Sequence, residues 1–404
     1  MRPPLARQAR GGPPFAWPVS LAISAILAFS GCAKKLKPGD SLPGLTKEER
    51  AAFDAGRLVF ERKFEPGTGL GPIFNADACA ECHESPVSGG PGEEVEIHVS
   101  AFFPDSFFCD PLVHKGGPVI QQHVTEALKA ALGIDSEPMP TEATGVARRT
   151  TPDLFGFGLL DAVPDSVILA LADPEDRNGD GISGRPNRFF DGRIGRFGRK
   201  GIVPTLSEFN QGAFVVEQGI TNPAVPDEET IGGLPIPEGV DPVPEPEIDQ
   251  KAIDLTDAFV RFLAPPAPQG LSSEAKRGRE IFSEIGCASC HVPSLRTGNS
   301  PVGALRYKKV AAYTDLLLHD MGPELADICL GEATPSEFRT EPLMGLRLSS
   351  QIEEGEPRFL HDGRASTIEE AIRLHGGEAA ASRDRFVGLA KDRRRELLAF
   401  LKTL

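Results

Sequence analysis

The chain has 404 residues, of which 40% are hydrophobic and 25% are charged; this composition is typical of a globular protein and excludes a disordered or fibrous chain. Its length predicts two or three domains. Lys and Arg number 43 against 58 Asp and Glu, and the resulting net charge of −15 argues against binding to nucleic acid or to an anionic membrane by charge. A basic redox or protein partner is compatible with this charge.

Residues 1–31 are predicted to be a signal peptide. Three arginines precede an apolar run over residues 15–29, which has the length of a signal sequence and is short for a membrane span. The run ends at Phe29-Ser30-Gly31-Cys32, which resembles a bacterial lipoprotein cleavage box with Phe29 where Leu is usual. On this interpretation Cys32 is the lipidated first residue of a periplasmic, outer-membrane lipoprotein, and residues 32–45 form a tether. The alternative is plain signal cleavage with an incidental cysteine.

The cysteines carry the main chemical information. Four of the seven form two C-x-x-C-H motifs, Cys79-Ala80-Glu81-Cys82-His83 and Cys287-Ala288-Ser289-Cys290-His291. In this motif each thiol forms a thioether with a haem vinyl group, and the histidine ligates the iron. One copy alone could be a redox dithiol or half of a zinc site. Two complete copies in an exported chain predict two covalent c-type haems with His83 and His291 as proximal ligands.

Cys109 and Cys329 are left when the haem cysteines and Cys32 are set aside. In an oxidising compartment this pair can form one disulfide, which would join the two halves of the chain. Such a bridge requires Cα atoms within about 7 Å of each other, and the sequence does not give that distance. The alternative is two separate buried thiols.

The chain contains two similar halves. A capped amphipathic helix precedes each haem motif, beginning after Thr46 in the first half and after Ser272 or Ser273 in the second. Each half ends in a helix with apolar residues at three- and four-residue steps. We therefore expect a mainly α fold with two cytochrome c-like domains, residues 46–266 and 271–404. Each domain would wrap around one covalent haem with long loops.

The first half is longer than the second because it carries insertions. Residues 222–250 contain seven prolines, eight acidic residues and no basic residue. This composition predicts an extended, solvated excursion. The glycine-rich residues 88–94 predict a shorter loop of the same kind.

Further motifs give the chain a family resemblance. They occupy residues 69–75, 154–160, 180–185, 316–322 and 361–365. Together with the haem motifs they resemble the bacterial di-haem oxidoreductase family, a relative of di-haem cytochrome c peroxidases and MauG-type enzymes. The resemblance covers essentially all of the chain after the signal peptide. It implies a haem in each half, electron exchange with a small redox protein, and peroxidase-like activity in which one haem takes electrons and the other reacts.

The resemblance also implies a sixth iron ligand for the second haem. In the peroxidase pattern this ligand stands 14 residues after the histidine of a His-x-Gly motif, which leads here from His361 to His375. Peroxidases usually carry Met there, and MauG-type enzymes carry Tyr. A His in place of Met would give the haem iron a lower reduction potential, because a thioether favours ferrous iron. Met321 and Met344 are the alternatives. We expect His319 and His361 to form hydrogen bonds near the haem edge.

A peroxidase needs an open or openable iron at the first haem and an acid/base nearby. In related peroxidases a helix that begins Thr-Leu supplies a Gln and, ten residues later, a Glu. The helix from Thr205 carries Glu217, our candidate acid/base, but Ser207 stands where the Gln would be. The alternative for Glu217 is a solvated helix charge.

Other residues could instead close the sixth position of the first haem, namely His98, His114 and His123. The protein would then be a non-catalytic periplasmic electron-transfer cytochrome with both irons six-coordinate. The spin state of each iron distinguishes this function from a peroxidase-like enzyme.

A short segment resembles the start of a calcium loop. Asp176, Asn178 and Asp180 stand at its first, third and fifth positions, with a glycine at the sixth. Asn187 replaces the bidentate Glu at position twelve, so we predict a looser calcium site than an EF-hand. Di-haem relatives hold calcium between their domains. The alternative is a simple Asp/Asn/Gly turn.

Overall fold

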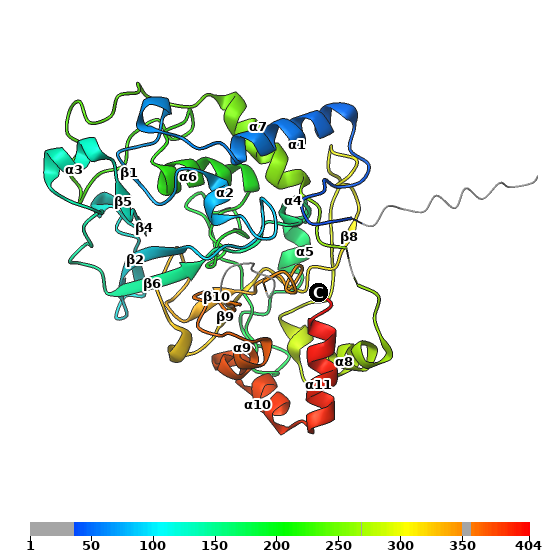
Figure 1. Ribbon diagram of the computed structural model, residues 1–404. Coiled ribbons are helices and arrows are strands. Elements are labelled where there is room, and N and C mark those ends of the chain that lie inside the picture. The colour runs from blue at the N-terminus through cyan, green and yellow to red at the C-terminus, as the bar shows by residue number, and fades with distance from the viewer. Residues whose placement is uncertain (1–35, 268, 350–356) are drawn as a thin grey trace, which may run out of the picture. The chain divides into compact units, whose positions relative to one another are not determined.

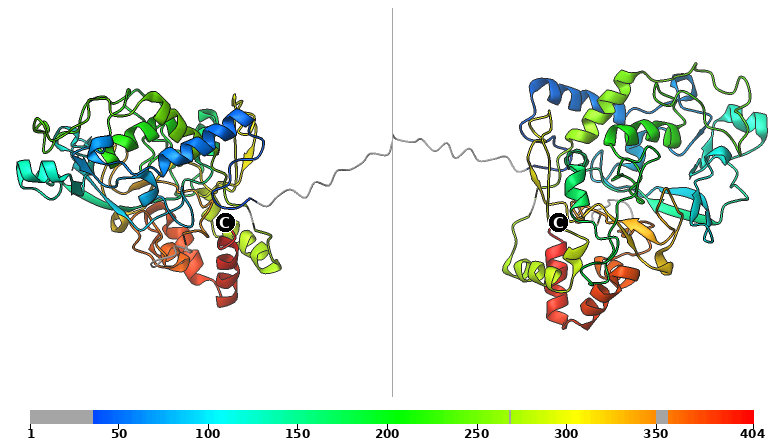
Figure 2. Two further views of the ribbon diagram at one scale, coloured as in Figure 1. Left: turned by 45° about the horizontal axis from the view of Figure 1, so that its top comes forward. Right: turned by 180° about the vertical axis from the view of Figure 1, so that it is seen from behind.

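Two pairs of packed helices flank the haem motifs in the computed structural model, which describes residues 36–267, 269–349 and 357–404 (Figure 1). In the first half α1 (Lys47–Phe60) packs along α7 (Gln250–Phe262). In the second half α8 (Ser273–Glu284) packs along α11 (Lys391–Leu401). Both pairs stay side by side in the other views of Figure 2. The predicted signal peptide and Cys32 lie outside the described residues.

In both helix pairs a glycine of one helix packs directly against the backbone of the other helix. A Cβ atom on Gly56 of α1 would collide with the carbonyl oxygen of Leu255 in α7. A Cβ atom on Gly278 of α8 would collide with the carbonyl oxygen of Glu396 in α11. The two helix backbones therefore touch at equivalent points of the two halves, as an internal duplication would place them.

The helices begin where the sequence indicated. The hydroxyl of Thr46 accepts a hydrogen bond from the backbone N–H of Glu49, whose carboxylate accepts one from the N–H of Thr46 in return. This reciprocal pair is a capping box. Ser272 caps α8 and Thr205 caps α6 (Leu206–Gln218) in the simpler way, by accepting one backbone hydrogen bond. Local side-chain chemistry sets all three helix starts.

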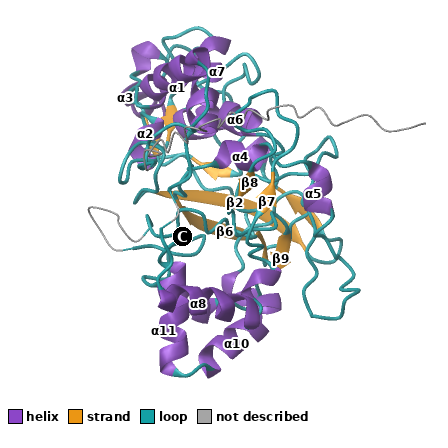
Figure 3. Ribbon diagram, turned by 90° about the vertical axis from the view of Figure 1, so that its right-hand side faces the viewer, coloured by secondary structure: helices purple, strands orange, loops and turns teal. Residues whose placement is uncertain are grey.

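A β-sheet accompanies the helices, and the prediction of a mainly α fold is wrong in this respect. β2 (Val95–Phe103) pairs antiparallel with β3 (Phe108–Asp110), β4 (Val119–Ile120) and β6 (Gly145–Thr150). Figure 3 shows β2 and β6 between the helices of the two halves. With 32% helix and 14% strand the fold is mixed α/β. The physical reason is the alternation of apolar residues along β2, which suits a half-buried strand and has no counterpart in the helical plan of a cytochrome c domain.

The other elements are short. The helices are η1 (Pro66–Thr68), α2 (Cys79–Cys82), η2 (Val113–Lys115), α3 (Glu126–Leu132), α4 (Phe157–Asp161), α5 (Asp165–Leu169), η3 (Cys287–Ser289), η4 (Pro323–Leu325), α9 (Ile368–Leu374), η5 (Gly377–Ala379) and α10 (Ala380–Gly388). The strands form antiparallel pairs: β1 (Ile73–Phe74) with β5 (His123–Val124), β7 (Leu295–Arg296) with β8 (Lys309–Val310), and β9 (Leu318–Asp320) with β10 (Glu337–Arg339).

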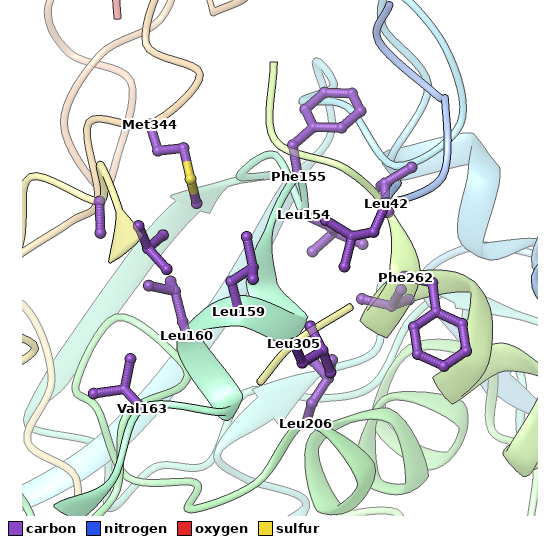
Figure 4. Packing of buried hydrophobic residues seen from close by; sticks show 14 of the residues in the cluster. Leu42, Leu154, Phe155, Leu159, Leu160, Val163, Leu206, Phe262, Leu305 and Met344 are labelled. Atoms are coloured by element: carbon purple, nitrogen blue, oxygen red, sulfur yellow. The ribbon is translucent and has the colours of Figure 1, made fainter. Parts of the chain in front are cut away.

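The largest apolar cluster contains residues of both halves. Phe155 and Leu160 from the first half pack in it together with Leu305 and Met344 from the second (Figure 4). Burying one such large side chain stabilises the fold by about 1.5–3 kcal/mol. Residues 36–404 accordingly form one compact unit.

The insertion of residues 222–250 packs against the rest of the chain. Its Ile231 and Val240 are buried in a small apolar cluster with Ile73 and Leu128. The prediction of a solvated excursion is wrong in part: most residues of the segment are exposed, but a few apolar side chains among the prolines and acids anchor it at intervals.

Cys109 and Cys329 form a disulfide, with their Cα atoms 5.8 Å apart. The bridge joins β3, in the sheet of the first half, to the segment after η4 in the second half. In the part of the chain that the structure describes, no helix is both long and apolar enough to cross a membrane.

Candidate functional site

Both C-x-x-C-H motifs hold their histidine in the same way. The Nδ1 atom of His83 lies 3.0 Å from the carbonyl oxygen of Pro152, and Nδ1 of His291 lies 3.0 Å from the carbonyl oxygen of Tyr313. A histidine that donates from Nδ1 to a carbonyl keeps its Nε2 lone pair free for a metal. Both imidazoles are thus oriented as iron ligands.

Cys79, Cys82 and Cys287 lack the low pKa of a redox-active thiol. Burial raises the pKa of Cys79 to about 12 and that of Cys287 to about 12, and it raises the pKa of Cys82 as well. Reactive cysteines have lowered pKa values because the thiolate is the nucleophile. The arrangement therefore favours thioether attachment over dithiol chemistry.

The glycine-rich segment of residues 88–94 folds back onto the first motif. The backbone N–H of Gly89 donates to the carbonyl oxygen of His83 over 2.9 Å. A Cβ atom on Gly92 would collide with the carbonyl oxygen of Cys82. The glycines are needed here for close backbone approach. The prediction of a solvated loop is wrong for this segment, since Gly89, Gly90 and Gly92 are buried.

A cavity of about 280 Å³ adjoins the second motif. Cys287, Cys290, His291 and His375 all line it. Much of the rest of its wall is apolar, and includes Phe282, Leu343, Leu346, Phe359, Ile368 and Ile372.

Four arginines also line this cavity: Arg199, Arg339, Arg358 and Arg383. Guanidinium groups pair well with carboxylates, and a haem carries two as its propionates. Two thiols, two imidazoles, apolar walls and cationic side chains together fit a haem at this cavity.

His375 follows the last residue of α9. Its Nδ1 atom lies 2.7 Å from the carbonyl oxygen of Ala371, one turn earlier, which again leaves Nε2 for a ligand. Burial, and then the charge of His375, lower the pKa of His291 to about 4, so the two imidazoles interact electrostatically across the cavity that both line. Met321 also lines the cavity, whereas Met344 packs in the large apolar cluster. Of the three predicted candidates, His375 has the geometry that best suits an iron ligand.

His319 lines the same cavity between two carboxylates. Its Nε2 atom lies 2.9 Å from Oδ2 of Asp315, and its Nδ1 atom lies 2.8 Å from Oε2 of Glu378. Burial opposes the charge, but the acidic partners raise the pKa of His319 well above its ordinary value. The hydroxyl of Ser183 donates to the other oxygen of Glu378 over 2.6 Å. His319 is therefore held as an imidazolium beside Cys290.

His361 also lines the cavity, and it is neutral. Its ring stacks on Phe338 with centroids 4.2 Å apart. Burial lowers the pKa of His361 to about 4. The two histidines expected near the haem edge are thus both at the second cavity, in opposite protonation states.

Glu217 lies beside the first motif. Its Oε2 atom accepts a hydrogen bond of 3.2 Å from the amide of Asn75, and its carboxyl lies close to that of Glu96. Burial, and then the charge of Glu96, raise the pKa of Glu217 well above its ordinary value. Glu217 is close enough to Cys79 and Cys82 for a charge on its carboxyl to raise the pKa of both thiols, which places it near the haem attachment point. The alternative of a solvated helix charge does not fit these surroundings.

The three histidines that could fill the sixth coordination position of the first haem differ in burial. The side chain of His98 is 12% exposed, with Nε2 2.9 Å from Oε2 of Glu96. His114 and His123 are exposed. His98 is therefore the one of the three that belongs to the polar cluster around Glu217.

The predicted calcium loop forms a tight, exposed turn. The backbone N–H of Gly181 donates to both carboxylate oxygens of Asp176, over 3.2 and 3.1 Å. The N–H of Asp180 donates to Oδ1 of Asn178 over 2.9 Å. The same bonds describe Asx turns, so calcium binding stays a prediction.

A buried ion cluster was not foreseen from the sequence. Oδ1 of Asp327 lies 2.9 Å from Nζ of Lys200, and Oδ2 lies 3.0 Å from the guanidinium of Arg149. Lys200 is fully buried. Arg149 and Asp327 are 178 residues apart, and no local pattern marks their pairing.

Residues 133–404 match the sequence model of the family described as "Di-haem oxidoreductase, putative peroxidase". The chain belongs to the di-haem oxidoreductase family. The resemblance drawn from the sequence motifs is thereby confirmed, and haem is the cofactor of this oxidoreductase.

Two solved structures are similar to this di-haem oxidoreductase. Hydrazine synthase of Kuenenia stuttgartiensis is 14% identical with a TM-score of 0.40, and the match covers 98% of this chain and 100% of that chain. A MauG-like protein associated with microbial copper homeostasis is 16% identical with a TM-score of 0.34, and the match covers 92% and 93% of the two chains. The comparison with curated proteins found no match.

Proposed function

We propose that this di-haem oxidoreductase is an exported enzyme with two covalent c-type haems, which takes electrons at the second haem and reacts with peroxide at the first. The observation that carries the proposal is a difference between the two motifs. The second motif adjoins a cavity with a further imidazole, His375, whereas the first adjoins a half-buried carboxyl with a raised pKa, Glu217.

At the second site, His291 and His375 would both hold the haem iron. The carbonyl oxygens of Tyr313 and Ala371 fix both imidazoles with Nε2 free. Two imidazole ligands suit an electron-entry site, because an iron with both axial positions filled exchanges electrons without binding a substrate.

At the first site, bound haem would supply an iron to which peroxide can bind. His83, oriented by Pro152, would hold it from the proximal side. Burial raises the pKa of Glu217 well above its ordinary value, which favours the protonated carboxyl. Its carboxyl can therefore give a proton to the leaving oxygen of peroxide and take one from the other oxygen. Asn75 orients the carboxyl through its hydrogen bond to Oε2.

We further propose that the protein is periplasmic, with a lipid anchor at Cys32. Two features support this location: the signal-like N-terminal sequence and the disulfide of Cys109 and Cys329, a bond typical of oxidising compartments. The electron donor would be a small redox protein, and the net charge of −15 favours one with a basic surface. Asp176, Asn178 and Asp180 would bind calcium in the turn that precedes Ser183.

Peroxide turnover with Glu217→Gln tests the function. The variant keeps the size of the side chain and loses the acid, so we expect the turnover number to fall by about 10²–10⁴ while haem content is unchanged. Glu208→Gln changes a carboxylate on the same helix that is paired with Arg193, and should retain turnover. Equal turnover in Glu217→Gln and wild type would contradict the assignment of Glu217.

The alternative, a non-catalytic electron-transfer cytochrome, is favoured by one observation: His98 is buried in the same cluster as Glu217. If His98 closes the first iron, the oxidised and half-reduced protein would both be entirely low-spin and inert to peroxide. His98→Ala would then create a high-spin signal that the wild type lacks.

A further inference from the structure

A line of buried polar side chains leads from the first haem site into the insertion of residues 222–250. Gln121 stands in the middle of it and is fully buried. Its side-chain amide donates a hydrogen bond of 3.0 Å to Oε2 of Glu229, a residue of the insertion. It also donates to the carbonyl oxygen of Val216, which precedes Glu217 in α6.

A second carboxyl joins the line at the backbone of Gln121. Oε2 of Glu137 accepts a hydrogen bond of 3.0 Å from the N–H of Gln121, and the N–H of Glu137 donates to the carbonyl oxygen of Gln121 over 2.9 Å. Glu137 is 3% exposed. Gln121 thus holds one carboxyl with its backbone and another with its side chain.

Asn75 connects this group to Glu217. Its amide donates to Glu217 over 3.2 Å and also lies 3.5 Å from the carbonyl oxygen of Val216, the acceptor that Gln121 uses. Two amide side chains therefore meet at one carbonyl group, with Glu217 on one side and Glu229 on the other.

Two oxygens in this line lack a hydrogen-bond partner in the protein: Oε1 of Gln121 and Oε1 of Glu137. Buried polar atoms are almost always hydrogen-bonded, and ordered water supplies the partner where the protein does not. Both residues are more than nine-tenths buried, so each unpaired oxygen marks a place for a bound water. A water can pass a proton between carboxyls, which an amide alone does not do.

Burial raises the pKa values of the carboxyls in this line, and neighbouring charges add to the effect. Burial raises the pKa of Glu229 to about 7, and burial followed by the charge of Glu229 raises that of Glu137 to about 8. Glu217 faces Glu96 on β2, Glu229 and the amide of Asn75. Beyond it, Glu96 faces His98, His83 and Arg149.

We propose that Glu229, Glu137 and Glu217, together with bound water at Gln121, form a proton relay that supplies the first haem site. Glu229 is half-buried and is the entry point, and Glu137 is a proton store next to it. The relay deepens the proposed function and rests on it. Reduction of one peroxide to two waters breaks the O–O bond and consumes two electrons from the reduced redox protein and two protons. The relay is the source of those protons.

Proton uptake by the holoprotein tests the relay. The fully reduced protein is mixed with hydrogen peroxide in weak buffer containing a pH-indicator dye, in a stopped-flow instrument. We expect Glu229→Gln to slow proton uptake about tenfold or more, because proton transfer through a positioned group carries at least such a factor. Glu229→Asp keeps a carboxyl and should recover part of the rate. Glu238→Gln, an exposed position of the same insertion, is the matched control and should equal wild type.

A second arm separates the relay from the peroxidase function. In this arm an electrode reduces the first haem in the absence of peroxide. The added electron favours uptake of a proton, and the same dye measures the rate of this uptake. If wild type does not turn over peroxide but Glu229→Gln still slows this uptake, the function fails and the relay stands. If Glu229→Gln and Glu137→Gln both take up protons at the wild-type rate with full haem content, the relay is wrong.

Discussion

Nδ1 of His83 lies 3.0 Å from the carbonyl oxygen of Pro152. Pro152 also lines the cavity of the second motif, together with its neighbours Thr150, Thr151 and Asp153. One four-residue segment therefore orients the proximal histidine of the first site and forms part of the wall of the second. In the proposed function, electrons that enter at the second haem would reach the first haem through this shared segment.

Loss of Asp327 should destabilise the protein strongly. Its carboxylate lies between Lys200 and Arg149, both buried, and Asp327→Ala leaves two buried cations without it. We expect the free energy of unfolding to fall by about 3–5 kcal/mol, measured by urea unfolding and circular dichroism. Asp384→Ala removes an exposed carboxylate and should change it by less than about 0.5 kcal/mol. A similar loss in both variants would contradict the role of the buried cluster.

Removal of the disulfide should destabilise the protein, because the bridge restricts the conformations of the unfolded chain. The bridge closes a loop with a sequence separation of 220, and the double variant Cys109→Ser, Cys329→Ser releases it. We expect a loss of about 2–5 kcal/mol in the free energy of unfolding. Thiol titration of the unfolded wild type without reductant gives the complementary result. Because the haem-motif cysteines would be thioethers, two reactive thiols beyond Cys32 would show that the bridge does not form.

The imidazolium of His319 should make stability depend on pH. Its carboxylate partners raise its pKa in the folded state, so its contribution is complete below the unfolded pKa of about 6.5 and declines as pH rises toward the folded value. Between about pH 6.5 and 9 the free energy of unfolding of His319→Gln should therefore fall less steeply with pH than that of wild type. His114→Gln, at an exposed position, should keep the wild-type slope. Identical slopes in all three proteins would mean that His319 is not charged in the folded state.

The parts of the site that sequence predicted are those fixed by local chemistry. The spacing of each C-x-x-C-H motif is covalent in origin, and the caps at Thr46 and Thr205 involve residues three apart. His375 came from the family pattern, 14 residues after His361, and the structure places it directly after α9; its role as an iron ligand stays a prediction.

The parts that sequence did not predict depend on contacts between distant segments. Glu96 lies close to Glu217 because it stands on β2, which pairs with β6. The sequence patterns predicted only helices and loops in the first half, so this strand was missed. Glu229 lies in a segment whose composition indicated solvent, yet the anchoring of Ile231 and Val240 turns it inward. Such contacts are decided by tertiary packing and leave no local pattern.

The most direct test of the account is the spin state of each iron, by electron paramagnetic resonance, in oxidised wild-type holoprotein and in His375→Gly. We expect the second haem of wild type to be low-spin, and His375→Gly to add one high-spin signal with both haems still attached. His375→Met should stay low-spin with a higher potential, because a thioether favours ferrous iron. His123→Gly, an exposed position, should leave the spectrum unchanged. If His375→Gly has the wild-type spectrum, His375 is not an iron ligand and the proposed division between an electron-entry haem and a reactive haem is contradicted.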